Sequence, residues 1–310
     1  MKNISIISPV YNEEKNLPFL INKFLELKKE IEKKDYQLKI IFVNDGSSDN
    51  SRKYIEGAIK NNDFISIINL TKNFGHQEAI YAGLKETTAD YYGVIDSDLQ
   101  QDPILFNNML RNLEDHNCDI VQMQKKYSNY ESSLKIFFSK FFYKIFNKLT
   151  KIDLRPGSSD FYLFSNQVKE SIISTHISKN FIRGYIHWAG FKTIFIQYTP
   201  EKRNFGKSNY SFIKQLEFAM TGIYYYGQKI SLYILVLAII ILLISFIYIL
   251  YLIYDHYFMG TQIKGWATIT ILILIFGTIN IFLTSILAFF VIKVFNTTGK
   301  KPTYLKKNKS

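Results

Sequence analysis

Two long apolar segments near the end of the 310-residue chain restrict its possible folds more than any other feature. Residues 230–254 and residues 266–292 contain no charged side chain. Each segment has about 25 residues, enough for a helix to cross a hydrocarbon core of roughly 30 Å. A pair of buried core helices is the alternative, but soluble helices of this length normally carry charges on one face. We therefore predict two transmembrane helices joined by a short external loop, residues 255–265.

The distribution of lysines predicts the orientation of this hairpin. Lys229 precedes the first apolar segment, and the tail after the second, residues 293–310, contains Lys293 and further lysines. The connecting loop has one lysine and one aspartate. Because positive charge is retained on the cytoplasmic side, both termini and the preceding domain are expected in the cytoplasm. No signal peptide is expected at the start of the chain.

Two further segments have the pattern of helices that lie at a membrane surface. Within residues 132–150, lysines recur every four residues and phenylalanines fill the opposite side of a helix, which favours a position among lipid headgroups. A helix packed on the domain core is the alternative. Residues 211–229 are a second candidate, leading into the first span.

Residues 1–210 are expected to form one α/β domain. Apolar, β-branched runs alternate with stretches of helical spacing, which predicts a mostly parallel sheet covered by helices on both faces. The single cysteine, Cys118, excludes an internal disulfide and a thiolate zinc cluster, and is expected to be buried. The expected strands are residues 4–10, 38–43, 65–70, 91–95 and 120–123, and the expected helices are residues 17–31, 51–59, 77–84 and 104–113.

Polar residues follow three of these strands. The segments are 9–14, 44–49 and 96–98, and all three are expected at one edge of the sheet, where ligands bind in folds of this class. Asp96 and Asp98, two residues apart, suit Mg²⁺ or Mn²⁺ on a nucleotide diphosphate. The segment 44–49 is also compatible with an ordinary turn before a helix. No P-loop or dinucleotide-binding glycine motif is present.

These residues resemble family 2 glycosyltransferases of the GT-A fold. The matching motifs are Ser8-Pro9-Val10-Tyr11-Asn12-Glu13-Glu14, Val43-Asn44-Asp45-Gly46-Ser47-Ser48-Asp49 and Asp96-Ser97-Asp98-Leu99-Gln100. Within the family, the chain is similar to the polyprenyl-phosphate glycosyltransferases, with Asn73-Phe74-Gly75-His76-Gln77 and Asp160-Phe161-Tyr162-Leu163 as further matching stretches. The family pattern Asp-Ala-Asp-Leu-Gln-Asp-Pro-Pro is altered at Ser97 and from Gln101 onward, and neither change removes a ligand.

The resemblance implies roles for individual residues on the donor side. Four of them would hold the nucleoside of a nucleotide-sugar donor: Pro9, Tyr11, Glu13 and Asp45. Asp96 would contact the ribose or the sugar, and Asp98, with Asp96, would bind the divalent cation.

On the acceptor side, the resemblance places Asp160 as the catalytic base. A phosphate monoester is already largely ionised at neutral pH, with a second pKa of about 6, so we interpret Asp160 as an orienting or proton-managing group. A structural role as a helix cap is the alternative. Arg203, Lys207 and, more weakly, Arg183 would bind phosphate groups.

The function implied by the resemblance is inverting transfer of one sugar, from a donor such as UDP-glucose to undecaprenyl phosphate in a bacterial inner membrane. The Gln-x-x-Arg-Trp motif of processive synthases is missing. The alternatives are another sugar, such as GDP-mannose or UDP-N-acetylhexosamine, another lipid acceptor, or an inactive membrane-bound scaffold. The relatives suggest a tetramer. A nucleic-acid partner is not expected despite the net charge of +12, because the lysines cluster at membrane-facing positions and no recognition motif is present.

Overall fold

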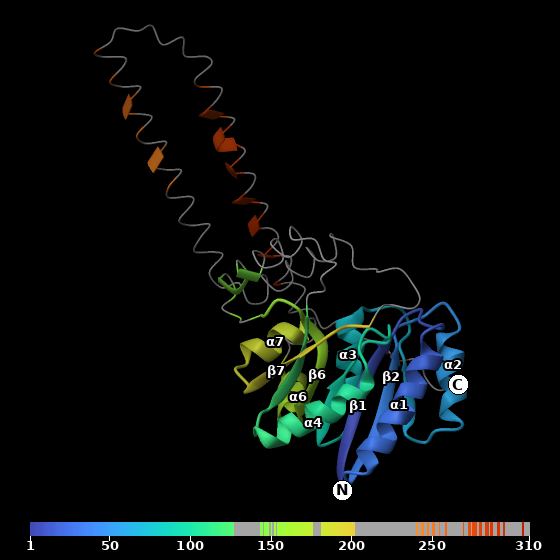
Figure 1. Ribbon diagram of the computed structural model, residues 1–310. Coiled ribbons are helices and arrows are strands. Elements are labelled where there is room, and N and C mark those ends of the chain that lie inside the picture. Colours follow the sequence, from blue (N-terminus) through green and yellow to red (C-terminus); the bar gives the residue numbers. More distant parts are fainter. Residues whose placement is uncertain are drawn as a thin grey trace. The chain divides into compact units, whose positions relative to one another are not determined.

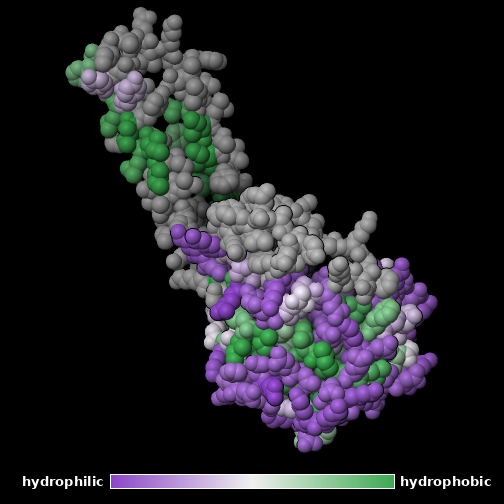
Figure 2. Space-filling view, in the orientation of Figure 1, coloured by the Kyte–Doolittle hydropathy of each residue, from purple (hydrophilic) through white to green (hydrophobic). Residues whose placement is uncertain are grey.

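A computed structural model describes residues 1–126, 154–175 and 181–201 without gaps, scattered residues within 143–152 and 240–294, and Lys306. The chain divides into two compact units, one of Met1–Gln228 with Thr303–Ser310 and the other of Lys229–Pro302. On the face shown in Figure 2, the described surface of the first unit is mostly hydrophilic. The described residues of the second unit are mostly hydrophobic and exposed, including Leu243, Ile244 and Ile247.

The first unit is built on a sheet that has seven strands within the described residues, in the order β3-β2-β1-β4-β6-β5-β7 (Figure 1). Neighbouring strands are parallel except at β6, which is antiparallel to both β4 and β5. The α/β fold with a mostly parallel sheet is thereby confirmed. The strands are β1 (Lys2–Val10), β2 (Tyr36–Asn44), β3 (Ile65–Asn69), β4 (Tyr91–Val94), β5 (Ile120–Lys125), β6 (Ser158–Ser165) and β7 (Thr193–Tyr198).

Helices cover both faces of this sheet (Figure 1). On one face pack α1 (Leu17–Glu32), α2 (Ser51–Ile59) and, after the short 3-10 helix η1 (Pro103–Leu105), α4 (Phe106–Asp115). On the other pack α3 (His76–Lys85), α6 (Asn166–Ser174) and α7 (Ile182–Trp188). The last seven residues of β1 are all buried, as expected for a strand covered on both faces.

The order of the strands creates a switch point between β1 and β4. From β1 the chain proceeds outward on one side to β2 and β3, and then returns to place β4 on the other side of β1. In open α/β sheets, ligands bind beyond the carboxyl ends of the strands at such a point. Val10 ends β1 and Val94 ends β4, so the segments that follow them flank the expected binding site.

Several predicted segments fall outside the described residues in whole or in large part. They are the interfacial helix 211–229, the spans 230–254 and 266–292, and most of 132–150 and 293–310. No helix that is sufficiently long and apolar to cross a bilayer is found among the described residues. Within 132–150, Phe146 is helical and buried in the core beside Phe181, so at this position the apolar side packs on protein.

The tail contributes one described residue to the first unit. Lys306 pairs with Leu70 in an isolated antiparallel bridge, and its Nζ lies 2.7 Å from a carboxylate oxygen of Glu86. The tail therefore contacts the sheet beyond β3 and the end of α3.

Candidate active site

The loops that follow β1 and β2 hold each other through side-chain to backbone hydrogen bonds. The carboxamide Oδ1 of Asn12, a residue with φ of 57°, accepts the N–H of Ser48 at 2.8 Å. In the opposite direction, the N–H of Asn12 donates to Ser47 Oγ at 3.1 Å, and that of Glu14 donates to Asp49 Oδ2 at 3.1 Å. The two polar segments predicted to share one edge of the sheet therefore form a single wall beside the switch point.

Three of the predicted nucleoside-binding residues lie on this wall. Pro9 is buried at the end of β1, and its carbonyl accepts a hydrogen bond from Ser97 Oγ at 2.9 Å. Tyr11 is exposed, so its ring is accessible to a planar base. Glu13 is partly buried, and its carboxylate accepts a hydrogen bond from Asn16.

The fourth, Asp45, is buried and holds a neighbouring loop. Its carboxylate accepts the N–H of Phe74 at 2.7 Å and the N–H of Gly75 at 3.0 Å. Burial raises the pKa of Asp45 above its ordinary value, although the two N–H groups act against this rise. Asp45 therefore fixes the chain that enters α3, and with it the position of His76, the first residue of that helix.

Asp96 is held in place directly after β4. The Gln101 side chain makes two hydrogen bonds with Asp96. Its Oε1 accepts the Asp96 N–H at 3.0 Å, and its Nε2 donates to Asp96 Oδ2 at 2.7 Å. Burial raises the pKa of Asp96 to about 6, with Asp98 and Asp160 adding to the rise and His76 opposing it. The carboxylates of Asp98 and Asp160 therefore lie close enough to Asp96 to disfavour its ionised form.

Asp98 supplies a second carboxylate in the same loop, where its Oδ1 accepts the N–H of Gln100 at 3.1 Å. Mg²⁺ is commonly held by one or two protein carboxylates together with substrate phosphates. The described residues contain no group of three or more His, Cys, Asp or Glu side chains arranged for a metal. Asp96 and Asp98 would supply the protein carboxylates for such a cation, with the remaining ligands from a diphosphate and water.

Asp160 lies in β6 and is almost surrounded by donors. Arg183 reaches both carboxylate oxygens, Gln77 Nε2 donates to Oδ2 at 3.0 Å, and the Tyr162 hydroxyl donates to Oδ1. Burial alone would raise the pKa of Asp160, but Arg183 and His76 hold it well below its usual range. A carboxylate stabilised in this way is a weak base. Its place within a strand also differs from the helix cap considered as an alternative.

His76 lies between two carboxylates, that of Asp96 after β4 and that of Asp160 in β6. Its Nε2 lies 3.3 Å from Asp96 Oδ1 and 3.4 Å from Asp160 Oδ2. Partial burial acts to lower the pKa of His76, but Asp160 and Asp96 outweigh it and raise the pKa to about 9. Neither His76 nor its neighbour Gln77 was predicted as a site residue. Their sequence position could have indicated this, because they follow a third parallel strand, β3, whose carboxyl end lies at the same edge of the sheet as those of β1 and β2.

The predicted phosphate-binding residues are only partly described. Arg183, in α7, pairs with Asp160 and is largely buried. Arg203 and Lys207 lie outside the described residues.

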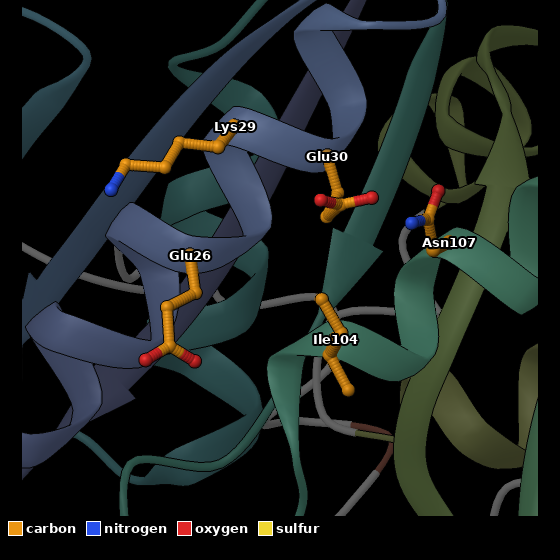
Figure 3. Close-up of a pocket in the computed structure, with 5 residues that line it drawn as sticks. All are labelled: Glu26, Lys29, Glu30, Ile104 and Asn107. Atoms are coloured by element: carbon orange, nitrogen blue, oxygen red, sulfur yellow. The ribbon is translucent and has the colours of Figure 1, made fainter.

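A separate surface depression lies between α1 and the η1–α4 segment (Figure 3). It is lined by Glu26, Lys29, Glu30, Ile104 and Asn107. None of the carboxylates at the switch point contributes to it, so it is distinct from the candidate active site.

Comparisons with known proteins find relatives in sequence and in fold. Residues 5–173 match the model of "Glycosyl transferase family 2". An uncharacterized glycosyltransferase from Synechocystis sp. is 30% identical over 97% of this chain and 94% of its own length. A bactoprenol glucosyl transferase from Shigella phage SfX is 28% identical over 99% of both chains. Mannosyl-3-phosphoglycerate synthase from Rubrobacter xylanophilus shares the fold, with a TM-score of 0.53, 12% identity and 74% of each chain covered.

Proposed function

The chain belongs to glycosyl transferase family 2, and from this membership and the site geometry we propose that it transfers one sugar from a nucleotide diphosphate to a polyprenyl phosphate. That the protein is a glycosyltransferase follows from the family. The lipid acceptor is supported by the similarity to a bactoprenol glucosyl transferase, which extends over almost the whole of both chains. UDP-glucose is the donor we propose first; GDP-mannose and UDP-N-acetylhexosamine are the alternatives.

The observation that carries this proposal is the meeting of Asp96 and Asp160 at His76 beyond the carboxyl end of β4, with Asp98 in the same loop as Asp96. Tyr11, Glu13 and the wall formed by the loops after β1 and β2 would hold the nucleoside. Asp98, together with Asp96, would hold Mg²⁺ or Mn²⁺, whose charge stabilises the leaving diphosphate.

The reaction forms one bond and breaks one bond. An oxygen of the acceptor phosphate attacks the anomeric carbon from the side opposite the leaving group, which inverts that centre. The bond between the anomeric carbon and the donor diphosphate breaks, and the nucleoside diphosphate leaves. Because the acceptor oxygen is already largely ionised at neutral pH, the side chains need mainly to orient it and to offset negative charge.

We further propose that the enzyme acts at the cytoplasmic face of a bacterial inner membrane, anchored by residues 230–254 and 266–292. The acceptor phosphate lies in the headgroup plane, and an anchored domain keeps its site at that level. Arg203 and Lys207 would bind phosphate groups, and the protein would assemble as a homotetramer.

A donor screen tests this function. Full-length protein in detergent is mixed with Mg²⁺ or Mn²⁺, a short polyprenyl phosphate and a panel of UDP- and GDP-sugars, and lipid-linked sugar is followed by mass spectrometry. One product mass is expected, lost in EDTA and in Asp98→Ala. The matched control is Asp63→Ala, which removes a 94% exposed carboxylate at the opposite edge of the sheet and should leave the product unchanged. Nucleotide release without a lipid product would contradict the proposed acceptor.

A further inference from the structure

The side chains around Asp160 differ sharply in their accessibility. The Asp160 side chain is 5% exposed and that of Arg183 is 13% exposed, and Tyr162 and Gln77 are buried. His76, in direct contact with Asp160, is 41% exposed. A ligand that approaches this cluster from solvent therefore meets the imidazole of His76 before it reaches the carboxylate of Asp160.

The position of His76 is fixed from three directions. Asp45 holds the two residues before it through their N–H groups. Gln77, the residue after it, donates to Asp160 and accepts the N–H of Ile182 at 3.1 Å. The imidazole itself rests against two carboxylates. Such constraints hold a substrate-contacting group close to one productive geometry.

The two carboxylates that His76 contacts belong to the two sides of the reaction. Asp96 follows β4, in the loop proposed to hold the cation and the donor. Asp160 is the residue that the family resemblance places near the acceptor. His76 Nε2 lies 3.3 Å from Asp96 Oδ1 and 3.4 Å from Asp160 Oδ2, and beside a carboxylate oxygen an imidazole nitrogen serves as the donor. The exposed imidazole of His76 thus lies between the loop proposed to hold the donor and the carboxylate that the family resemblance places near the acceptor.

We propose that His76 is the side chain through which this cluster contacts the phosphate of the lipid acceptor, and that Asp160 is a positioning residue that acts through His76. The inference rests on the proposed function and names a contact within it. Arg183 is less suited to this contact, because it is largely buried and directs two nitrogens at Asp160.

The test measures KM for polyprenyl phosphate, KM for the nucleotide sugar, and kcat in full-length variants. His76→Ala should raise the acceptor KM by about tenfold or more, the effect of losing a hydrogen bond to a charged group, while the donor KM changes by less than about twofold. His76→Gln keeps an N–H donor and should restore part of the acceptor affinity. His116→Ala is the matched control, since this exposed histidine directly follows α4 and its Nδ1 lies 3.1 Å from Asn112 O.

A second comparison tests the positioning role of Asp160. Asp160→Asn should raise the acceptor KM in the wild-type background, and should add little in a His76→Ala background, because its effect passes through His76. If Asp160→Asn instead raises the acceptor KM by the same factor in both backgrounds, Asp160 acts independently of His76, and that part of the inference is overturned.

Failure of the proposed function and failure of the inference on His76 give different results. If the wild-type protein forms no lipid-linked sugar, both the proposed function and this inference fall. If it is active and both His76 variants keep the wild-type acceptor KM, only the inference falls. A rise confined to the donor KM would place His76 on the donor and would also overturn it. A cooperative melting transition above the assay temperature establishes that each variant is folded.

Discussion

Arg183 contacts both carboxylate oxygens of Asp160, with Nη2 2.8 Å from Oδ2 and Nε 3.0 Å from Oδ1. This pair ties β6 to α7 beside the switch point. Two-point contact of this kind is the strongest form of arginine–carboxylate hydrogen bonding. It lowers the proton affinity of Asp160, so the residue is better suited to positioning its neighbours than to removing a proton.

Breaking this pair should destabilise the fold. Asp160→Asn removes the charge that the largely buried Arg183 faces, and is expected to lower the free energy of unfolding by about 3 kcal/mol at pH 7. Denaturant unfolding of the full-length protein measures the change. The control is Glu56→Gln, which breaks the half-exposed Arg52–Glu56 pair and should cost less than about 0.5 kcal/mol. Equal effects of the two substitutions would refute the structural role given to the Asp160–Arg183 pair.

The pKa of His76 predicts a pH dependence of stability. The pKa rises from 6.5 to about 9 in the folded state, so protonation of His76 favours folding. This contribution is complete below pH 6.5 and is lost as the pH rises through about 9. Among the described residues, the charged or titratable groups that interact with His76 are Asp45, Glu78, Asp96, Asp160 and Arg183.

Melting temperatures recorded from pH 6 to pH 9.5 test this dependence. The wild-type melting temperature should fall more steeply over this range than that of His76→Gln, whose side chain does not titrate. His116→Ala should follow the wild type, because it removes a histidine outside the cluster. A His76→Gln variant with the same slope as the wild type would contradict the assignment.

The helices and strands up to β5 were predictable because each has a local pattern of apolar residues. Helix α2 has the predicted bounds, Ser51–Ile59, and α1 starts at the predicted Leu17, with a proline in its first turn. The strands β6 and β7 were not predicted. The antiparallel direction of β6 depends on pairing with β4 and β5, which are distant in sequence, so no local pattern specifies it.

The site was predictable where residues lie in compact motifs. Asp96 and Asp98 stand two residues apart after an apolar strand, and the polar loops after β1 and β2 are similarly distinctive. The place of His76 between Asp96 and Asp160 was not predictable in the same way. A histidine after a glycine at the start of a helix is ordinary locally, and its contact with Asp160 arises only when β6 is inserted beside β4.

Gln101 should affect donor binding through Asp96. Gln101→Leu removes both hydrogen bonds that hold Asp96 and leaves its partly buried N–H without this acceptor, so we expect a loss of about 1–3 kcal/mol in stability. Because Asp96 is then less well oriented, the donor KM should rise by about tenfold, with a smaller change for the acceptor. Titrations of both substrates check this. Gln197→Leu, at an exposed position of β7, is the control, and an unchanged donor KM in Gln101→Leu would refute the role of Gln101.

Gly46 should be irreplaceable for a steric reason. Its φ is +69°, and a Cβ added there would lie 2.4 Å from the carbonyl carbon of Lys72 and 2.6 Å from the nitrogen of Asn73. Both are backbone atoms, so the loop that leads to His76 must move. Gly46→Ala should therefore cost well over about 1 kcal/mol, the cost of the left-handed conformation alone, and should raise KM for both substrates.

Gly57→Ala is the same chemical change as Gly46→Ala, but we expect it to stabilise the fold. Gly57 lies within α2, and nothing stands within 4 Å of its added Cβ. Alanine there should increase the free energy of unfolding by about 0.5–1 kcal/mol, because it restricts the unfolded chain and favours helix, and activity should not change. Unfolding curves and substrate titrations of the two variants, measured side by side, decide the matter. If Gly46→Ala resembled Gly57→Ala in both measurements, the close approach of the β2 loop to Lys72 and Asn73 could not be a requirement of the active fold.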